Sequence, residues 1–344
     1  MPNSSPLNVL ENHSLKEYNT FGIDVKARYF IAARSEAALR DTLSTTMFDG
    51  LPRLILGGGS NLLLTHDFPG VVIRMALTGR HIVGRDNEAT YIEAAAGENW
   101  HDFVRWTLTQ GLSGLENLSL IPGSVGASPI QNIGAYGVEM KEMFHELTAI
   151  DIASGEIRRF DDTACGFGYR DSVFKHEQKD RAIITSVSFR LPHQVQLHLN
   201  YGEIPQELTR MNIANPTAQD VSNAVCNIRQ RKLPDPAKMG NAGSFFKNPI
   251  VDQTRFQSLQ KTHPQMPHYP ATDSRVKLPA GWLIEQAGWK GKTLGRAGVH
   301  AQHALVLVNL GNAEGAEILA LATAIQDSVQ NKFGIRLEPE PIIV

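Results

Sequence analysis

The glycine-rich run at residues 121–137 constrains the fold of this chain more than any other feature. It reads IPGSVGASPIQNIGAYG, in which glycines and alanines surround Ser, Gln and Asn and no residue is charged. Glycine has no Cβ to hold a ligand off the main chain, and it permits positive φ, so successive N–H groups can turn toward one anion or flat ring. A diphosphate-containing cofactor fits such a loop, although an ordinary loop-rich connection can have the same composition.

A second glycine run, Gly57–Asn61, follows a short apolar segment that is typical of a strand. It lacks the lysine and spacing of a P-loop and the GxGxxG order of a dinucleotide fold. Two uncharged glycine-rich loops suit a large cofactor whose diphosphate contacts both, such as FAD. On spacing alone, two unrelated turns remain the alternative. Neither run contains a His or Cys that could tether a flavin covalently.

Length and composition limit the class of protein. The chain has 344 residues, enough for two or three domains, and its 42% hydrophobic and 20% charged residues are typical of a soluble globular protein. Lys plus Arg number 33 against 35 Asp plus Glu, a net charge of -2, so no basic field exists for nucleic acid or anionic lipid. No signal peptide is recognisable and no apolar run approaches the ~18 residues of a membrane span, so we expect a cytoplasmic protein without membrane insertion.

Cysteine and histidine spacing gives no metal site. Cys165 and Cys226 are far apart and form no CxxC or Cys/His cluster, so we expect reduced thiols. His300 and His303 lack a third ligand at a suitable spacing. We therefore predict that the chain binds no metal.

Apolar periodicity predicts strands and helices in alternation. Asn99 is a predicted helix N-cap, Gly334 a predicted helix end, and Pro234 and Pro236 mark a predicted domain boundary. The predicted strands are 53–56, 70–76, 91–96, 182–191 and 304–310, with a hairpin at 147–160; the predicted helices follow Asn99, open at 216–217, surround Trp282 and span 313–333; the last ten residues are a predicted extended tail.

Three polar motifs could carry chemistry. GYRDSVFK sets Arg170 between an aromatic residue and an acid, and the guanidinium fork can orient a small anion. NAGSFFKNP contains Ser244, which has an exchangeable proton, and Asn248, which can hold an amide or anionic group. LEPE places Glu338 and Glu340 two apart in an extended segment, so their side chains point to opposite faces and composition favours neither.

Nine ordered motifs along almost the whole chain resemble the UDP-N-acetylenolpyruvoylglucosamine reductases, flavoenzymes of peptidoglycan precursor synthesis. They are NTFG, LGGGSNLL, AAGENW, GLENLSLIPGSVGASPIQNIGAYG, GYRDSVFK, RKLPDP, GNAGSFFKNP, AGWLIEQAG and LEPE. The resemblance implies an α+β protein with the FAD-binding fold of vanillyl-alcohol oxidase. It implies a first FAD-binding lobe at 1–78, to which the tail 335–344 returns, a second lobe at 79–229, and a substrate-binding domain at 230–334.

The resemblance also implies a reaction in two halves. NADPH reduces non-covalently bound FAD, and flavin N5 then delivers hydride to the enolpyruvyl β-carbon of UDP-N-acetylglucosamine enolpyruvate, giving UDP-N-acetylmuramate. Negative charge then develops at the α-carbon, so the site needs an electrophile and a proton donor. By resemblance these are Arg170 and Ser244, and Glu340 joins Arg170 in polarising the carboxylate. An ionised Glu340 would repel an enolate, so we expect a raised pKa for this carboxyl.

Binding positions follow from the same resemblance. The implied cofactor-binding residues are Gly57, Gly58, Gly59, Ser60, Asn61, Pro122, Gly123, Ser124, Gly126, Ala127, Gln131, Asn132, Gly134, Ala135, Tyr136 and Gly137, and the implied substrate-binding residues are Tyr169, Tyr201, Lys232 and Asn248. Tyr201 resembles the tyrosine that closes over substrate in one subclass. Two departures from the pattern are His303, where some relatives have a Gln that contacts the uridine diphosphate, and Pro341-Ile342 in place of Val-Arg.

Two other functions remain open from the sequence. One is an oxidase of the same flavin fold that passes electrons from a small alcohol or hydroxy acid to oxygen. The other is a nucleotide-sugar-binding or regulatory protein without catalysis. The expected ligands of the reductase are UDP-N-acetylglucosamine enolpyruvate and NADPH, with no nucleic-acid partner, and the expected oligomeric state is a monomer.

Overall fold

The computed structural model describes residues 7–271 and 273–344, which divide into two compact units. The first unit holds residues 7–13, 26–59 and 68–231, and the second holds 14–25, 60–67 and 232–344 apart from residue 272. Each unit therefore gathers segments that are distant in the sequence. Residues 1–6 of the predicted first lobe, and residue 272, lie outside the described residues, and the division into three domains stays a prediction.

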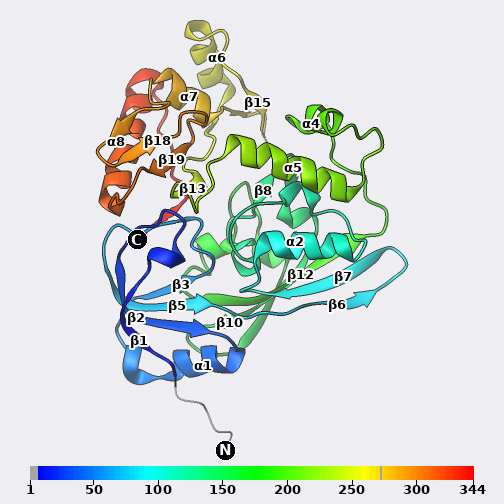
Figure 1. Ribbon diagram of the computed structural model, residues 1–344, viewed down its shortest axis with the longest axis vertical. Helices are drawn as coiled ribbons and strands as arrows, with labels where there is room; N and C mark the ends of the chain where they lie inside the picture. The colour runs from blue at the N-terminus through cyan, green and yellow to red at the C-terminus, as the bar shows by residue number, and fades with distance from the viewer. Residues whose placement is uncertain (1–6, 272) are drawn as a thin grey trace, which may run out of the picture. The chain divides into compact units, whose positions relative to one another are not determined.

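A four-stranded sheet forms one part of the first unit (Figure 1). In spatial order its strands are β1 (Leu10–Ser14), β2 (Lys26–Ala33), β5 (Phe68–Met75) and β3 (Arg53–Leu56). Strands β2, β5 and β3 are parallel, and the continuous apolar run of β5 is typical of a strand buried on both faces. Helix α1 (Glu36–Ser44), capped by Ser35, packs Leu39 into the core of this sheet.

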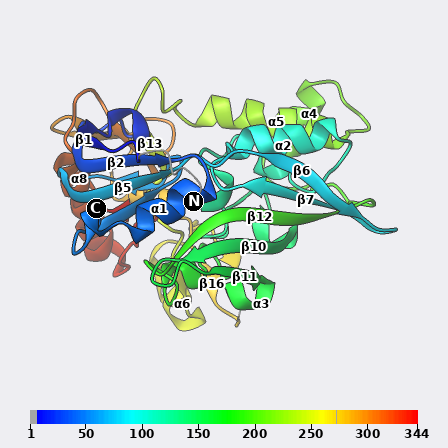
Figure 2. The same cartoon turned by 90° about the horizontal axis from the view of Figure 1, so that it is seen from below.

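A five-stranded antiparallel sheet forms the other part of the first unit, and Figure 2 shows its strands side by side. In spatial order they are β11 (Ile157–Asp161), β10 (Phe144–Asp151), β12 (Ala182–Pro192), β7 (Ala89–Ala95) and β6 (Arg80–Arg85). Helix α2 (Trp100–Thr109) packs against it through Trp100 and Phe103, whose ring centroids lie 5.9 and 5.1 Å from that of Phe189. The amino end of α2 is thereby fixed to the sheet.

Shorter elements complete the first unit. They are α3 (Asp162–Cys165), the two-residue strands β8 (Gly134–Ala135) and β9 (Val138–Glu139), α4 (Ile204–Arg210) and α5 (Ala218–Lys232), whose last residue belongs to the second unit. The Thr217 N–H donates to Asp220 Oδ2 at 2.9 Å and the Asp220 N–H to Thr217 Oγ1 at 3.3 Å, which confirms the predicted capping at the start of α5.

The second unit is built on the four-stranded sheet β13-β19-β18-β17 and the helices that accompany it. Its elements are β13 (Asn241–Ser244), β19 (Val306–Asn309), β18 (Ala297–Val299), β17 (Thr293–Leu294), β14 (Ile250–Val251), β16 (Val276–Lys277), β15 (Tyr269–Pro270), α6 (Gln253–Thr262), α7 (Ala280–Gln286) and α8 (Gly315–Phe333). The tail strand β20 (Ile342–Ile343) pairs in parallel with β4 (Leu62–Leu63).

The early segment 14–25 is also part of the second unit. The Asn241 N–H donates to Thr20 O at 2.9 Å, and Asn309 Nδ2 donates to Phe21 O at 2.9 Å. The Phe21 ring meets that of Phe245 edge-on, with centroids 6.3 Å apart. The NTFG motif thus supports strand β13 and, with it, the position of Ser244.

Many predicted elements are confirmed, and several were missed. The strand at 53–56, the hairpin through Ser154–Gly155, the Asn99 cap and the α8 end at Gly334, with φ of +61°, all agree with the structure. The elements that the sequence did not predict include β2, α1 and α6.

Cys165 and Cys226 are free thiols, as expected. Within residues 7–271 and 273–344, no helix is long and apolar enough to cross a membrane and no cluster of His, Cys, Asp or Glu could hold a metal ion.

Candidate active site

The glycines of the first run, Gly57–Gly59, and the glycine-rich loop 121–137 lie backbone to backbone in the first unit. A Cβ built on Gly58 would lie 2.9 Å from the Cα of Gly123, and one built on Gly57 would lie 2.6 Å from the Oγ of Ser124. Real Cβ atoms do not approach other atoms so closely, so this packing requires glycine. Gly59 has a φ of +61°, which also favours glycine. One ligand can therefore reach the main chain of both loops.

Ser124 offers a hydroxyl group to such a ligand. The residue is buried, and its Oγ has no hydrogen-bond partner among the described residues. A buried hydroxyl without a partner is costly, so an unpaired one at a glycine-lined contact indicates a ligand atom. A phosphate or ribose oxygen of FAD is such an atom, and the uncharged glycines leave room for its diphosphate. The residues therefore fit the cofactor predicted from the sequence.

The segment before α2 fixes the glycine-rich loop from one side. The Gly126 N–H donates to Ala96 O at 2.9 Å, and the Trp100 N–H donates to Gly123 O at 3.1 Å. A Cβ on Gly126 would collide with Ala96. The loop is consequently pressed against the end of β7 and the start of α2, where no side chain fits between the two backbones.

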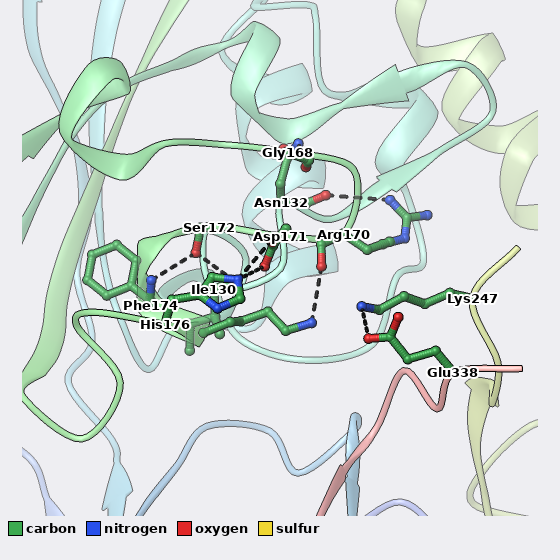
Figure 3. A network of polar contacts seen from close by, with 11 residues as sticks. Ile130, Asn132, Gly168, Arg170, Asp171, Ser172, Phe174, His176, Lys247 and Glu338 are labelled. Carbon is green, nitrogen blue, oxygen red and sulfur yellow. Dashed lines mark hydrogen bonds and ion pairs between the residues drawn. The ribbon is translucent and has the colours of Figure 1, made fainter. Parts of the chain in front are cut away.

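Asn132 links the glycine-rich loop to the segment that carries Arg170 (Figure 3). Its side chain is fully buried, and Nδ2 donates to Gly168 O at 3.0 Å and to Glu139 Oε2 at 2.9 Å. Its Oδ1 accepts the Lys141 N–H at 3.1 Å. Because its amide is hydrogen-bonded within the protein, the Asn132 side chain fixes the position of the glycine-rich loop rather than offering a free group to the cofactor.

Arg170 is held in a strained backbone conformation with φ of +54°. Its guanidinium donates to Gly134 O at 2.6 Å and to Asn132 O at 3.5 Å, the second of which Figure 3 shows. The Arg170 carbonyl accepts a hydrogen bond from Lys175 Nζ at 3.1 Å, and the guanidinium carbon lies 5.4 Å from the ring centre of Tyr169. These contacts orient the Arg170 guanidinium along the glycine-rich loop.

Tyr201 lies at the far end of the same loop. Its side chain is 54% exposed, and its ring meets that of Tyr136 edge-on with centroids 6.4 Å apart. A Cβ on Gly137 would lie 2.9 Å from Tyr201 Cδ2. The first unit thus contains Tyr201, Arg170 and most predicted cofactor positions, including Pro122, Ala127, Gln131 and Ala135.

Two predicted cofactor residues, Ser60 and Asn61, belong to the second unit. Asn61 Nδ2 donates to Glu340 O at 3.2 Å, and Asn61 O accepts the Ile342 N–H at 3.0 Å. The end of the first glycine run is therefore tied to the carboxyl-terminal tail.

The second unit places Ser244 beside the tail that carries Glu340. The Glu340 N–H donates to Phe245 O at 2.8 Å, and Phe246 forms an antiparallel bridge with Pro339. The tail therefore forms a short antiparallel ladder of backbone hydrogen bonds with the residues that follow Ser244. Of the three predicted catalytic residues, Ser244 and Glu340 lie on paired segments of the second unit, and Arg170 belongs to the first.

The other acid of the LEPE motif, Glu338, forms an ion pair with Lys247. Glu338 is 69% exposed, and its Oε1 lies 2.6 Å from Lys247 Nζ, as Figure 3 shows. Asn248 accepts the Ala280 N–H through Oδ1 at 2.9 Å, which fixes its amide at the amino end of α7. Its Nδ2 is then the group that a substrate can use.

Two histidines of the second unit have unpaired ring nitrogens. The Nδ1 atoms of His300 and His303 are buried and lack a hydrogen-bond partner among the described residues. Burial lowers the pKa of His303, and the charge of Lys232 lowers it further. Both rings therefore favour the neutral form, in which one nitrogen can accept and the other can donate a hydrogen bond.

A cavity of about 410 Å³ in the second unit lies away from these residues. It is at the amino end of α8, and none of the predicted site residues lines it. Its lining holds three acidic residues, Asp24, Asp67 and Glu314, against one lysine, Lys16, and an excess of negative charge repels a diphosphate. The backbone cradle of the first unit is therefore the better candidate for the cofactor.

Relatives of known function identify the family. Residues 235–344 match the family model described as UDP-N-acetylenolpyruvoylglucosamine reductase, C-terminal domain, and residues 27–161 match the FAD binding domain. A UDP-N-acetylenolpyruvoylglucosamine reductase of Pseudomonas aeruginosa is 56% identical over 335 residues, covering 97% of this chain and 98% of the relative. The chain belongs to the UDP-N-acetylenolpyruvoylglucosamine reductase family. It is an FAD-dependent oxidoreductase, as predicted.

Other similar proteins agree with this placement. The reductase of Paraburkholderia xenovorans is 53% identical over 335 residues, covering 97% of each chain. The crystal structure of the Thermus caldophilus reductase has a TM-score of 0.67 at 25% identity and covers 98% of both chains. p-Cresol methylhydroxylase, with a TM-score of 0.51 at 12% identity and coverage of 98% of this chain and 86% of its own, shares the fold alone. The predicted α+β FAD-binding fold of the reductase is confirmed.

Sequence reasoning missed the residues that support the site. Lys175 lies within GYRDSVFK, but nothing in the motif shows that its ammonium bonds to the Arg170 carbonyl. Glu139 and Lys141 follow the glycine-rich loop and fix Asn132. A buried Asn next to glycines is the signal that could have indicated them, because its amide must find partners when it is buried.

Proposed function

We propose that this chain reduces UDP-N-acetylglucosamine enolpyruvate to UDP-N-acetylmuramate with NADPH, a step in peptidoglycan precursor synthesis. The observation that supports the proposal is the backbone ladder between the residues that follow Ser244 and the tail that carries Glu340, in a chain of this reductase family. Bound FAD supplies the chemistry of hydride transfer from NADPH to the enolpyruvyl β-carbon. We expect the enzyme to act in the cytoplasm as a monomer.

Three side chains handle the charge and the proton. Arg170, whose guanidinium is oriented by Gly134 O, pairs with the substrate carboxylate and stabilises the negative charge that develops beside it. Glu340, in its protonated form, donates a hydrogen bond to the same carboxylate. The Ser244 Oγ donates its proton to the α-carbon, which completes the saturated lactyl ether. A general-acid step of this kind contributes ~10² to 10⁴ in rate.

Four other residues hold the nucleotide sugar. Lys232 supplies positive charge for the diphosphate, and Asn248 supplies its Nδ2. Tyr201 and Tyr169 contribute aromatic surface and hydroxyl groups. The exposure of the Tyr201 ring supports this role, because an exposed aromatic ring has apolar surface available for a ligand.

A product assay tests the proposal. Purified holoenzyme is incubated without oxygen with NADPH and UDP-N-acetylglucosamine enolpyruvate, and the products are identified by mass spectrometry. We expect UDP-N-acetylmuramate in a one-to-one ratio with the NADPH consumed. NADPH consumption only when oxygen is admitted, with the enolpyruvyl substrate unchanged, would contradict the proposal and favour an oxidase.

A further inference from the structure

Leu120, the residue immediately before the glycine-rich loop 121–137, has an unusual backbone. Its φ is +59°, a left-handed conformation that L side chains other than Asn and Asp rarely adopt. It precedes the loop whose Gly123 packs on Gly58 and whose Ser124 has an unpaired hydroxyl. The direction in which the chain leaves Leu120 therefore sets where these cofactor-facing groups lie.

Side chains from two helices hold both backbone polar groups of Leu120. Its N–H donates to Nδ1 of His101, the second residue of α2, at 2.9 Å. Its carbonyl accepts a hydrogen bond from Nε of Arg229, on α5, at 3.2 Å. The N–H and the carbonyl of the strained residue are thus both hydrogen-bonded to side chains from outside the loop.

The start of α2 holds the neighbouring backbone as well. Trp100 Nε1 donates to Leu118 O at 2.9 Å, and the Trp100 N–H donates to Gly123 O at 3.1 Å. Trp100 is buried in the core of the unit, so these contacts start from a rigid point. His101 completes the set with the contact to Leu120, the strained residue of the segment.

The chemical state of His101 suits this contact. Because Nδ1 accepts the Leu120 N–H, the ring proton of neutral His101 must be on Nε2, which lies 4.0 Å from Cys226 Sγ. Burial lowers the pKa of His101, and the charges of Arg105 and Arg229 lower it further, against the opposite influence of Asp102. Nδ1 therefore stays available as an acceptor at neutral pH.

We propose that His101 is a positioning residue for FAD binding, whose Nδ1 holds Leu120 in the left-handed conformation that aims the glycine-rich loop at the cofactor. The inference rests on the FAD binding of this family and not on the proposed substrate. The positioning depends on the Nδ1 atom of His101, whose hydrogen bond offsets the backbone strain at Leu120.

A pair of isosteric variants tests the role of Nδ1. In His101→Asn the amide oxygen takes the place of Nδ1 and can still accept the Leu120 N–H, whereas in His101→Gln the amide group takes the place of Nε2. The dissociation constant of FAD is measured by titrating apoprotein and following flavin fluorescence. We expect His101→Gln to weaken FAD binding about tenfold, the scale of one lost hydrogen bond to a buried group, and His101→Asn to stay within about threefold of the wild type.

A third substitution, Leu120→Gly, separates positioning from general packing. Glycine adopts positive φ without strain, so His101→Gln should weaken FAD binding by less than about threefold when it is introduced into the Leu120→Gly background. Urea unfolding of each apoprotein establishes that the variants fold, and only folded variants are compared. Equal losses of FAD affinity in His101→Asn and His101→Gln, or the same loss in both Leu120 backgrounds, would overturn the proposal, as would unchanged affinity throughout.

Discussion

At the scale of single residues, the absence of a Cβ decides which loops can approach one another. Gly58 lies against the main chain of Gly123, where a methyl group would sit 2.9 Å from Cα and 3.2 Å from the carbonyl carbon. Backbone cannot move aside as a flexible side chain can. The two glycine-rich loops would therefore have to separate if any side chain were added.

This contact predicts that Gly58→Ala weakens FAD binding by about tenfold or more, because displacement of a backbone cradle removes several hydrogen bonds at once. The dissociation constant of FAD is the measurement. Gly84→Ala is the matched control, since a Cβ there meets nothing within 4 Å and the residue lies in β6 of the same unit. Equal affinities of the two variants would contradict the prediction.

The role of Ser244 can be separated from its surroundings. Ser244→Ala removes the proposed proton donor and keeps the backbone ladder of β13, because the pairing with Val306 uses the main chain. We expect the reduction of bound flavin by NADPH to proceed nearly as in the wild type, and its reoxidation by the enolpyruvyl substrate to slow by ~10² or more. Stopped-flow absorbance measures both steps. Equal slowing of both would indicate a structural role for Ser244.

At the scale of elements, the amino end of α2 connects helix stability to the glycine-rich loop 121–137. The Asn99 side chain caps the helix by accepting the Asp102 N–H at 3.0 Å, and the main chain of Asn99 forms an isolated antiparallel bridge with Ser124. Ser35 caps α1 in the same way, accepting the Ala38 N–H at 3.1 Å, but it has no contact with the glycine-rich loops in the described hydrogen bonds.

The comparison of the two caps yields a prediction. Asn99→Ala and Ser35→Ala should each lower the free energy of unfolding by about 1 kcal/mol, the usual loss for a helix N-cap. Only Asn99→Ala should also weaken FAD binding. Denaturant unfolding of the apoproteins and FAD titration test both parts. A similar change in FAD affinity in the two variants would show that the effect comes from stability alone.

Local signals explain which elements could be predicted from the sequence. Asn99, Thr217 and Gly334 are caps whose side chain or conformation acts within one helical turn, and the hairpin at Ser154–Gly155 depends on neighbouring residues. β2 was missed because it pairs in parallel with β5. The chain between the two strands passes through α1 and β3, so no local turn marks the pair. The left-handed Leu120 was also missed, because its partners come from two distant helices.

At the scale of the whole molecule, each compact unit combines distant segments that no local pattern connects. Residues 14–25 and 60–67 join the carboxyl-terminal part in the second unit through contacts such as Asn309 to Phe21. The motif order predicted the family, the FAD cofactor and the fold, because long motifs in a fixed order are specific even where each is ambiguous. Periodicity could not predict that Ser60 and Asn61 fall in a different unit from Gly57–Gly59.

Half-buried histidines make the stability of the molecule depend on pH. Burial lowers the pKa of His101, His300 and His303, and the cations Arg105, Arg229, Lys232 and Lys290 act in the same direction. The unfolded state therefore binds more protons below its ordinary His pKa of about 6.5, and stability falls as the pH falls through that range.

We expect the free energy of unfolding to decrease between pH 7.5 and 5.5, with a slope of at most about 1.4 kcal/mol per pH unit for each histidine. Urea unfolding at several pH values measures it. His303→Gln should reduce the slope, because glutamine does not titrate. A stability that rises as the pH falls from 7.5 to 5.5 would contradict the prediction.

The central claim is that one protein passes reducing equivalents from NADPH, through FAD, to an enolpyruvyl nucleotide sugar. The most direct measurement reduces the bound flavin of the purified holoenzyme with one equivalent of NADPH without oxygen, adds UDP-N-acetylglucosamine enolpyruvate, and follows the flavin absorbance. The account predicts prompt return of the oxidised spectrum when the substrate is added. A flavin that stays reduced until oxygen is admitted would contradict it.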